Sequence, residues 1–129
     1  MFKPSLIFVL FSLIIGCRSQ TIEDYRKDLQ SDDVDKICNA CYYIGEAKDK
    51  ESVVSLLKDI YDERTSHHAR YKGMSVYYCK AGALKKITGL NINIQQHQPP
   101  DSVIISKFIN WAIEQKLIDS VERIKLSNL

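Results

Sequence analysis

Apolar positions along most of the chain recur at the spacing of amphipathic helices. Between Thr21 and Gln30 the apolar residues fall three and four positions apart, which is the helical period. The same spacing recurs in four further stretches: 34–47, 51–61, 74–87 and 101–113. A last short helical turn is expected over 119–126. Strand-like alternation is confined to Asn91–Ile94, so the pattern predicts an all-α protein.

Residues that cap helices stand at the ends of these stretches. Candidate caps stand at the starts of three of the stretches: Thr21, the run Ser31-Asp32-Asp33, and the pair Asp101-Ser102. Their side chains suit the first backbone N–H groups of a helix. Gly89 follows the fourth stretch and suits the left-handed conformation that ends a helix. Residues 91–100, which end in a Pro-Pro pair that resists helix, are predicted to form the one long loop.

The first 17 residues form a separate, apolar unit. Lys3 precedes an uncharged run over 6–15, which is shorter than the roughly 20 residues that cross a membrane. A charged start, an apolar core and a small residue, here Gly16, are the parts of a secretory signal. The sequence IIGC, which ends at Cys17, resembles the lipobox of bacterial lipoproteins. That resemblance implies removal of residues 1–16 and acylation of the Cys17 thiol; a core helix or a plain secretory signal is the alternative.

What remains, residues 17–129, has the length of one lipid-anchored domain. The chain holds 18 Lys and Arg against 16 Asp and Glu, and removal of Lys3 leaves 17 against 16. So balanced a charge, without a basic run, argues against nucleic acid as a partner. The lipobox resemblance implies a domain that faces the periplasm. Arg18 is not the Asp that marks retention at the inner membrane, so the outer membrane is favoured.

Two segments forty residues apart occupy similar places in their helices, YIGEA at 43–47 and ALKKI at 83–87. A period of this size is typical of helical solenoids. The stretch YYIGEAKDKESVVSLLKDI, residues 42–60, resembles the HEAT-like repeat of the phycobilisome-lyase type, and AGALKKITGLN with the helix of Trp111 resembles a terminal unit. The resemblance covers about 22–115. It implies a short α-solenoid of stacked antiparallel helix pairs, about five helices, that serves as a binding scaffold.

Two departures from the repeat concern its second half. The connection from Ile60 to Ala83 is longer than the repeat pattern, so either the inner helix is extended or a loop with His67 and His68 bulges out. Lys85 stands where the repeat has glycine. Nothing beyond the repeat indicates pigment chemistry.

The register of the repeat implies a core side and an exposed side for two inner helices. The core side holds Ile37, Cys41, Ile44, Tyr77, Ala81 and Leu84. The exposed side holds Lys36, Asn39, Tyr43, Glu46, Val76, Cys79, Lys80, Ala83 and Lys86. This exposed side is the candidate protein-binding face, because tyrosine brings a large contact area with few rotatable bonds. Alternatively, the tyrosines fill gaps between helices: Tyr42, Tyr43, Tyr71, Tyr77 and Tyr78.

Three cysteines remain besides Cys17. Cys38 and Cys41 form a CxxC, but they lie within a predicted helix and follow no strand, unlike a thioredoxin-type motif. A Cys38–Cys79 or Cys41–Cys79 disulfide is expected if the Cα atoms approach within about 7 Å; buried, unpaired thiols are the alternative. Zinc ligation with His67 or His68 lacks the usual ligand spacing. The sequence predicts neither a metal nor a cofactor.

No grouping of nucleophile, base and acid can be identified, so the chain is predicted not to be an enzyme. The predicted function is a membrane-anchored, periplasm-facing binder of another protein. An immunity protein that neutralises a periplasmic toxin and an adaptor in an envelope assembly are the two forms considered. A thiol-binding or metal-binding lipoprotein is the third hypothesis.

Overall fold

The computed structural model describes residue 16 and residues 18–127. Residues 1–15 and Cys17, which hold most of the predicted signal peptide and the predicted lipidation site, lie outside the described residues. The elements are α1 (Ile22–Asp28), α2 (Val34–Glu46), η1 (Lys50–Ser52), α3 (Val53–Leu57), α4 (Val76–Thr88), α5 (Ser102–Glu114) and α6 (Ser120–Ser127). Within the described part, extended pairing is limited to one bridge between Thr65 and Ser75. The predicted all-α class is confirmed.

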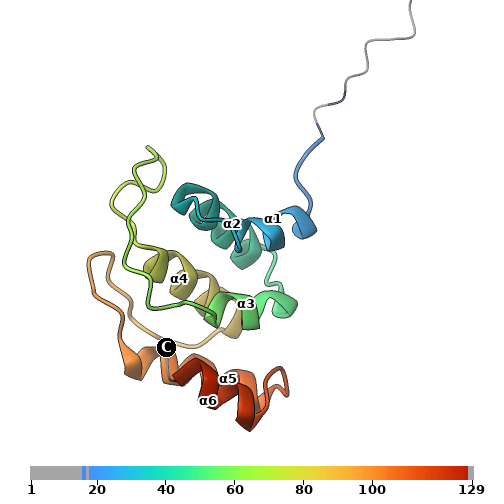
Figure 1. Cartoon of the computed structure of the whole chain (residues 1–129), viewed down its shortest axis with the longest axis vertical. Coiled ribbons are helices and arrows are strands. Elements are labelled where there is room, and N and C mark those ends of the chain that lie inside the picture. Colours follow the sequence, from blue (N-terminus) through green and yellow to red (C-terminus); the bar gives the residue numbers. More distant parts are fainter. Residues whose placement is uncertain (1–15, 17, 128–129) are drawn as a thin grey trace, which may run out of the picture.

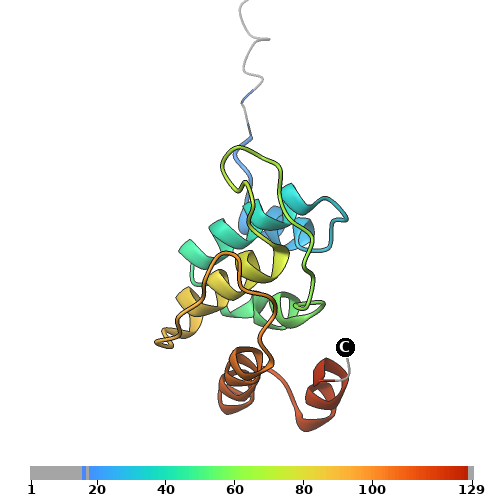
Figure 2. The same cartoon turned by 90° about the vertical axis from the view of Figure 1, so that its left-hand side faces the viewer.

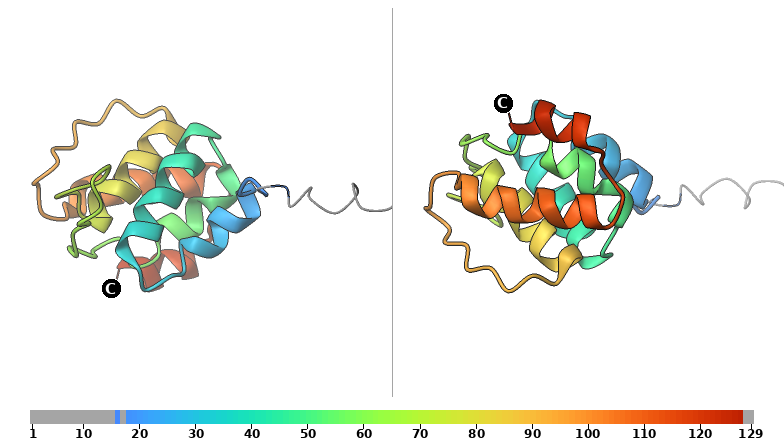
Figure 3. Two further views of the ribbon diagram at one scale, coloured as in Figure 1. Left: turned by 90° about the horizontal axis from the view of Figure 1, so that it is seen from above. Right: turned by 90° about the horizontal axis from the view of Figure 1, so that it is seen from below.

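The helices are stacked in three layers (Figures 1 and 2). The upper layer contains α1 and α2, the middle layer α3 and α4, and the lower layer α5 and α6. Helix α2 packs most extensively against α4, and α4 also contacts α3 and α5. From below, α5 and α6 lie side by side across the rest of the domain (Figure 3). None of the helices in the described range is both long and apolar enough to span a bilayer.

The predicted capping residues explain where the helices begin and end. Thr21 forms a reciprocal capping box with Asp24 at the start of α1. The side chains of Asp33 and Asp101 accept backbone N–H bonds at the starts of α2 and α5. Gly89 adopts the left-handed conformation, with φ at 70°, at the end of α4.

Helices α2 and α4 run in the same direction and lie unusually close together. Near their starts Cys38 is bonded to Cys79, and at their ends Lys86 forms an ion pair with Glu46. Gly45 makes the close approach possible, because a Cβ atom at this position would lie 3.1 Å from the Cα atom of Ala83. Residues that face each other across the two helices are therefore about forty positions apart in the sequence.

The structure corrects the predicted exposure of three residues on α4. Val76, Lys80 and Ala83 were expected on the exposed side, but they are buried, with exposed fractions of 0%, 4% and 3%. The reason is that α4 lies in the middle layer and is enclosed by α2, α3 and α5. An enclosed helix has no broad solvent face on which these side chains could lie.

Lys80 shows how a charged residue is accommodated in this setting. Its ammonium group donates a hydrogen bond of 2.6 Å to the carbonyl oxygen of Lys58, just past the end of α3. Burial lowers the pKa of Lys80, while the nearby carboxylates of Asp59 and Asp62 act in the opposite direction. Lys80 thus joins α4 to the end of α3 and is not available to a partner.

The chain between α3 and α4 also differs from the prediction. The helix predicted over 51–61 is reduced to η1 and α3, which ends at Leu57, and α4 begins only at Val76. Residues 58–75 form a long loop, so residues 91–100 are not the only one. Of the two alternatives for this connection, the structure contains the loop with His67 and His68. Helix α3 ends early because the backbone turns extended at Lys58, with ψ at 131°, and Asp59 has a positive φ of 52°, which no helix can include.

Candidate functional site

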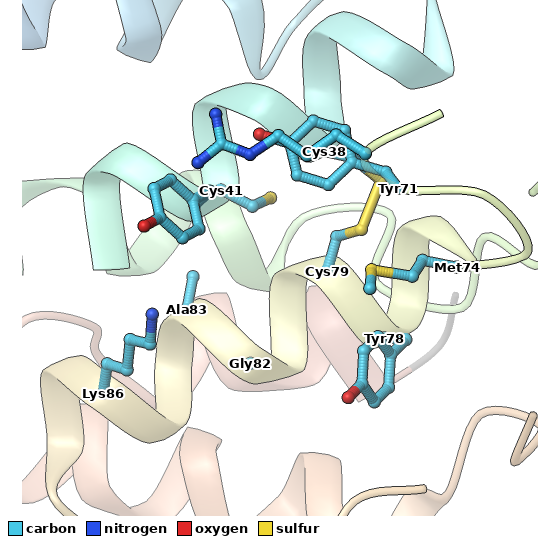
Figure 4. A pocket seen from close by; sticks show the side chains of 11 residues that line it. Cys38, Cys41, Tyr71, Met74, Tyr78, Cys79, Gly82, Ala83 and Lys86 are labelled. Carbon is cyan, nitrogen blue, oxygen red and sulfur yellow. A yellow bond between two sulfur atoms is a disulfide. The ribbon is translucent and has the colours of Figure 1, made fainter. Parts of the chain in front are cut away.

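A pocket opens between α2, α4 and the 58–75 loop. Its volume is about 340 Å³. Figure 4 shows the Cys38–Cys79 disulfide and Met74 on one side, Ala83 and Gly82 along α4, and Lys86 at one end. The lining residues are Cys38, Cys41, Tyr42, Arg70, Tyr71, Met74, Tyr78, Cys79, Gly82, Ala83 and Lys86. The pocket is thus mostly apolar and lies beside the bridge between the two helices.

The three cysteines among the described residues are divided into one disulfide and one thiol. Cys38 and Cys79 are bonded, with their Cα atoms 5.3 Å apart. This is one of the two bridges that the sequence allowed. Cys41 is free and buried, and burial raises its pKa to about 12. Its thiol therefore stays protonated at neutral pH, which argues against a reactive CxxC dithiol.

Three side-chain contacts hold the 58–75 loop against α2 and the turn before it. Arg64 donates a hydrogen bond of 3.0 Å to the carbonyl oxygen of Asp32. The Ser66 hydroxyl donates to Asp35, and this bond is the main cause that lowers the pKa of the Asp35 carboxyl. The Tyr71 hydroxyl donates to Asn39 at 2.9 Å. Residues 70–74 are thereby fixed at the edge of the pocket.

Four tyrosines and one arginine form the tyrosine–arginine cluster: Tyr25, Tyr42, Tyr43, Tyr71 and Arg70. The rings of Tyr25 and Tyr43 stack with centroids 4.6 Å apart, and Tyr42 meets Tyr43 edge-on at 5.1 Å. The Arg70 guanidinium carbon lies 4.5 Å from the Tyr42 centroid, 5.6 Å from that of Tyr71 and 5.9 Å from that of Tyr43. Cation–π attraction therefore holds Arg70 among three rings.

The two cations beside the pocket differ in their partners. Lys86 pairs with Glu46, and its ammonium nitrogen lies 5.0 Å from the Tyr42 centroid. Among the described residues no carboxylate pairs with Arg70. Hydrogen bonding to Tyr43 raises the pKa of Arg70 above its already high ordinary value. Arg70 is therefore a permanent cation whose charge no side chain of the described domain neutralises.

The structure brings together only part of the predicted binding face. Asn39, Tyr43, Glu46 and Lys86 lie in or beside the cluster, and Lys36 is exposed on α2. Cys79, also predicted to be exposed, is half-buried in the disulfide. Val76, Lys80 and Ala83 are excluded by their burial.

Sequence reasoning missed Arg70 and Met74, which reach the site from the loop. No spacing in the sequence links residue 70 to residue 42, so only the tertiary contact reveals the pair. The tyrosines are divided between the two alternatives considered. Tyr71 and Tyr77 are buried as gap-filling residues, whereas Tyr42 and Tyr43 are 38% and 36% exposed.

Residues that could hold a metal are not gathered at this site. Across residues 18–127, no group of three or more His, Cys, Asp or Glu side chains is placed to ligate a metal ion. His67 and His68 are exposed on the loop.

Comparison with protein-family models, curated proteins and solved structures finds no match for this chain. The function proposed below therefore depends on the sequence and on the site itself.

Proposed function

We propose that this protein is a non-enzymatic lipoprotein that binds another protein through the tyrosine–arginine cluster. The observation that carries this proposal is the exposure of Tyr42 and Tyr43 beside Arg70. Tyrosine and arginine are enriched among the residues that dominate the energetics of protein interfaces. An exposed group of this composition is more useful to a binding protein than to the stability of an isolated domain.

The cluster is held in place before any partner arrives. The disulfide joins α2 to α4 beneath it, and Asn39 fixes Tyr71 through a hydrogen bond. Stacking with Tyr25 restricts the Tyr43 ring. A surface that is already ordered loses little conformational entropy on association, which favours affinity.

The proposed location is the periplasmic side of a bacterial membrane, with the acyl anchor on Cys17. The lipobox resemblance supports the anchor, and Arg18 favours the outer membrane. The Cys38–Cys79 disulfide supports an oxidising compartment, because disulfides rarely persist in the bacterial cytoplasm. Radiolabelled palmitate should be incorporated into the wild-type chain. A Cys17→Ser variant that still incorporates label would contradict the proposed anchor.

We also propose that the helices form a short HEAT-like solenoid. The stacking of layers and the parallel contact of α2 with α4 support this arrangement. Two of the contacts between these helices join residues 41 and 40 positions apart, which agrees with the forty-residue repeat of the sequence.

Within this class, the preferred role is that of an immunity protein that neutralises a toxin in the periplasm. A small, rigid, anchored binder suits this role because it must intercept one protein close to the bilayer. Only a few residues, 18–21, separate Cys17 from the start of α1 at Ile22. The alternative is an adaptor in an envelope assembly. Expression that protects cells against a toxin encoded nearby would favour immunity, and failure to protect would favour the adaptor.

Affinity capture from the native cells tests the binding function. Wild-type protein with a soluble secretory signal in place of its anchor should retain a partner, and a Tyr43→Ala, Arg70→Gln variant should lose it. Tyr61→Ala is the matched control, because Tyr61 is equally exposed, at 37%, but lies beside Asp59 and Arg64 in another hollow. Capture that is reduced by Tyr61→Ala alone, or that survives the double substitution, would contradict the proposed surface.

A further inference from the structure

We propose that the pocket beside the disulfide binds one apolar side chain of the partner protein, and that Arg70 binds a carboxylate adjacent to it. This specifies the partner of the function proposed above and rests on that function. The partner surface would then present an apolar residue flanked by Asp or Glu.

The walls of the pocket account for the apolar part of this preference. Met74, Gly82, Ala83 and the Cys38–Cys79 disulfide contribute sulfur and carbon surface. A volume of about 340 Å³ accommodates a single large side chain such as that of phenylalanine or leucine. Transfer of such a side chain from water to the pocket is favourable because apolar surface is removed from water.

The rim accounts for the acidic part. Arg70 and Lys86 are the charged residues among those that line the pocket, and both are cations. Glu46 neutralises Lys86, which leaves Arg70 as the uncompensated charge. Arg70 lies close to the tyrosine rings and hydrogen bonds to Tyr43, but a guanidinium has five N–H donors, so others remain to donate a pair of hydrogen bonds to a carboxylate.

The surroundings of the pocket favour a protein over a free amphiphilic anion. Tyr42 forms part of the lining, and Tyr43 continues the surface outside the pocket. A small molecule seated in the pocket would leave the exposed part of Tyr43 uncovered, whereas a protein would cover both rings. A fatty acid offers the same combination of apolar chain and carboxylate and is therefore an outcome of the test.

Gly82 allows the pocket to be filled without disturbing the fold. It lines the pocket within α4, and a Cβ atom built on it meets no atom within 4 Å. Gly82→Leu should therefore occupy the space meant for the partner side chain. Gly82→Ala is the matched control, since it changes the backbone freedom in the same way but leaves the pocket open.

The test uses the purified full chain, labelled with ¹⁵N, and acetylated, amidated peptides followed by NMR. The sequence Gly-Asp-Phe-Asp-Gly should shift the amide signals of Met74 and Gly82. Replacement of the phenylalanine by alanine, or of both aspartates by asparagine, should weaken binding about tenfold, as expected for the loss of a buried side chain or a charge-assisted hydrogen bond. Gly82→Leu and Arg70→Gln should each weaken binding to a similar degree, and Gly82→Ala should not.

Several results would overturn this inference. Peptide binding that is insensitive to Gly82→Leu would show that the pocket is not the binding site. Absence of chemical shift changes up to about 5 mM peptide would also contradict the inference. Dodecanoate that binds in the pocket when the peptide does not would assign it to an amphiphilic anion instead. If Gly82→Leu still captures the cellular partner, the binding function stands and the pocket inference fails. If wild type captures no partner, the function fails, and the peptide titration still decides what the pocket accepts.

Discussion

Helices α2 and α4 pair residues that are about forty positions apart in the sequence. Of the two helices, only α2 presents a broad surface to solvent. Tyr43 in α2 is 36% exposed, whereas Ala83 in α4 is 3% exposed. Helix α2 packs against α1 and α4, while α4 is enclosed by α2, α3 and α5. The place of a helix in the stack therefore decides whether similar positions serve binding or packing.

The 58–75 loop adds to this contrast. It lies against α2 through Asp35 and Asn39 and against the preceding turn through Asp32, and it brings Arg70 to the exposed tyrosines. The α4 residues beneath contribute the pocket floor and little solvent surface. Binding and stability should therefore respond differently to substitutions in the two helices.

Loss of the bridge between the two helices should have the largest effect. Cys38→Ala with Cys79→Ala should lower the free energy of unfolding by about 4 kcal/mol, because the bridge closes a chain separation of 41 residues. Urea unfolding measures the change. Cys41→Ala is the control, with an expected loss of about 1 kcal/mol for one small buried side chain. Equal losses in the two variants would contradict a stabilising role for the bridge.

Substitutions at Ala83 and Tyr43, which occupy corresponding positions in α4 and α2, should lower the free energy of unfolding by different amounts. Ala83→Tyr should lower the free energy of unfolding by about 2 kcal/mol, because Ala83 is buried where α4 packs closely against Gly45, and the ring must either push α2 away or turn into the pocket. Tyr43→Ala should cost about 1 kcal/mol, mainly through lost stacking on Tyr25. Thermal and urea unfolding would show the difference. Comparable losses at both positions would mean that α2 is as enclosed as α4.

Replacement of Asp49, which follows α2 in the chain, should give a pH-dependent loss of stability that is smaller than the loss expected without the disulfide. Arg26 donates two hydrogen bonds of 2.8 Å to Asp49, and these bonds are the main cause that lowers the pKa of Asp49. Asp49→Asn should therefore cost about 2 kcal/mol at pH 7. A lowered pKa stabilises the fold above the ordinary value of 3.8, and this contribution disappears as the pH falls through the lowered value.

Urea unfolding at pH 7 and at progressively lower pH measures this effect. The stability difference between wild type and Asp49→Asn should shrink below about pH 4. Glu51→Gln is the control, because Glu51 also pairs with Arg26 but its side chain is 78% exposed. A stability difference between wild type and Asp49→Asn that stays constant as the pH falls would show that the charge of the Asp49 carboxylate does not cause the stabilisation.

The features that could best be predicted from sequence were those determined by contacts between neighbouring residues in the chain. Thr21, Asp33, Gly89 and Asp101 each mark a helix end through bonds to nearby backbone. Thr21 and Gly89 could be predicted as single residues, and the other two ends to within the runs 31–33 and 101–102. The exposed face of α2 also follows from its apolar period. The burial of Lys80 could not be predicted, because it depends on Lys58, 22 positions away.

Only part of the candidate site could be predicted from sequence, again because some of its contacts join residues far apart in the chain. Tyr43, Glu46 and Lys86 share helix faces that periodicity can define. Arg70 reaches Tyr42 from an irregular loop, and the contacts that fix this loop join residues about thirty positions apart. Such pairings carry no periodic signature in a single sequence.

Site-specific photo-crosslinking in living cells tests whether the tyrosine–arginine cluster is the binding surface. A benzophenone amino acid replaces Tyr43 in one strain and Tyr61 in another, since the two side chains are almost equally exposed on different parts of the surface. If the cluster is the binding surface, position 43 gives a defined crosslinked protein and position 61 gives none. Crosslinks from position 61 alone, or from neither position, would contradict the assignment of the tyrosine–arginine cluster as the binding surface.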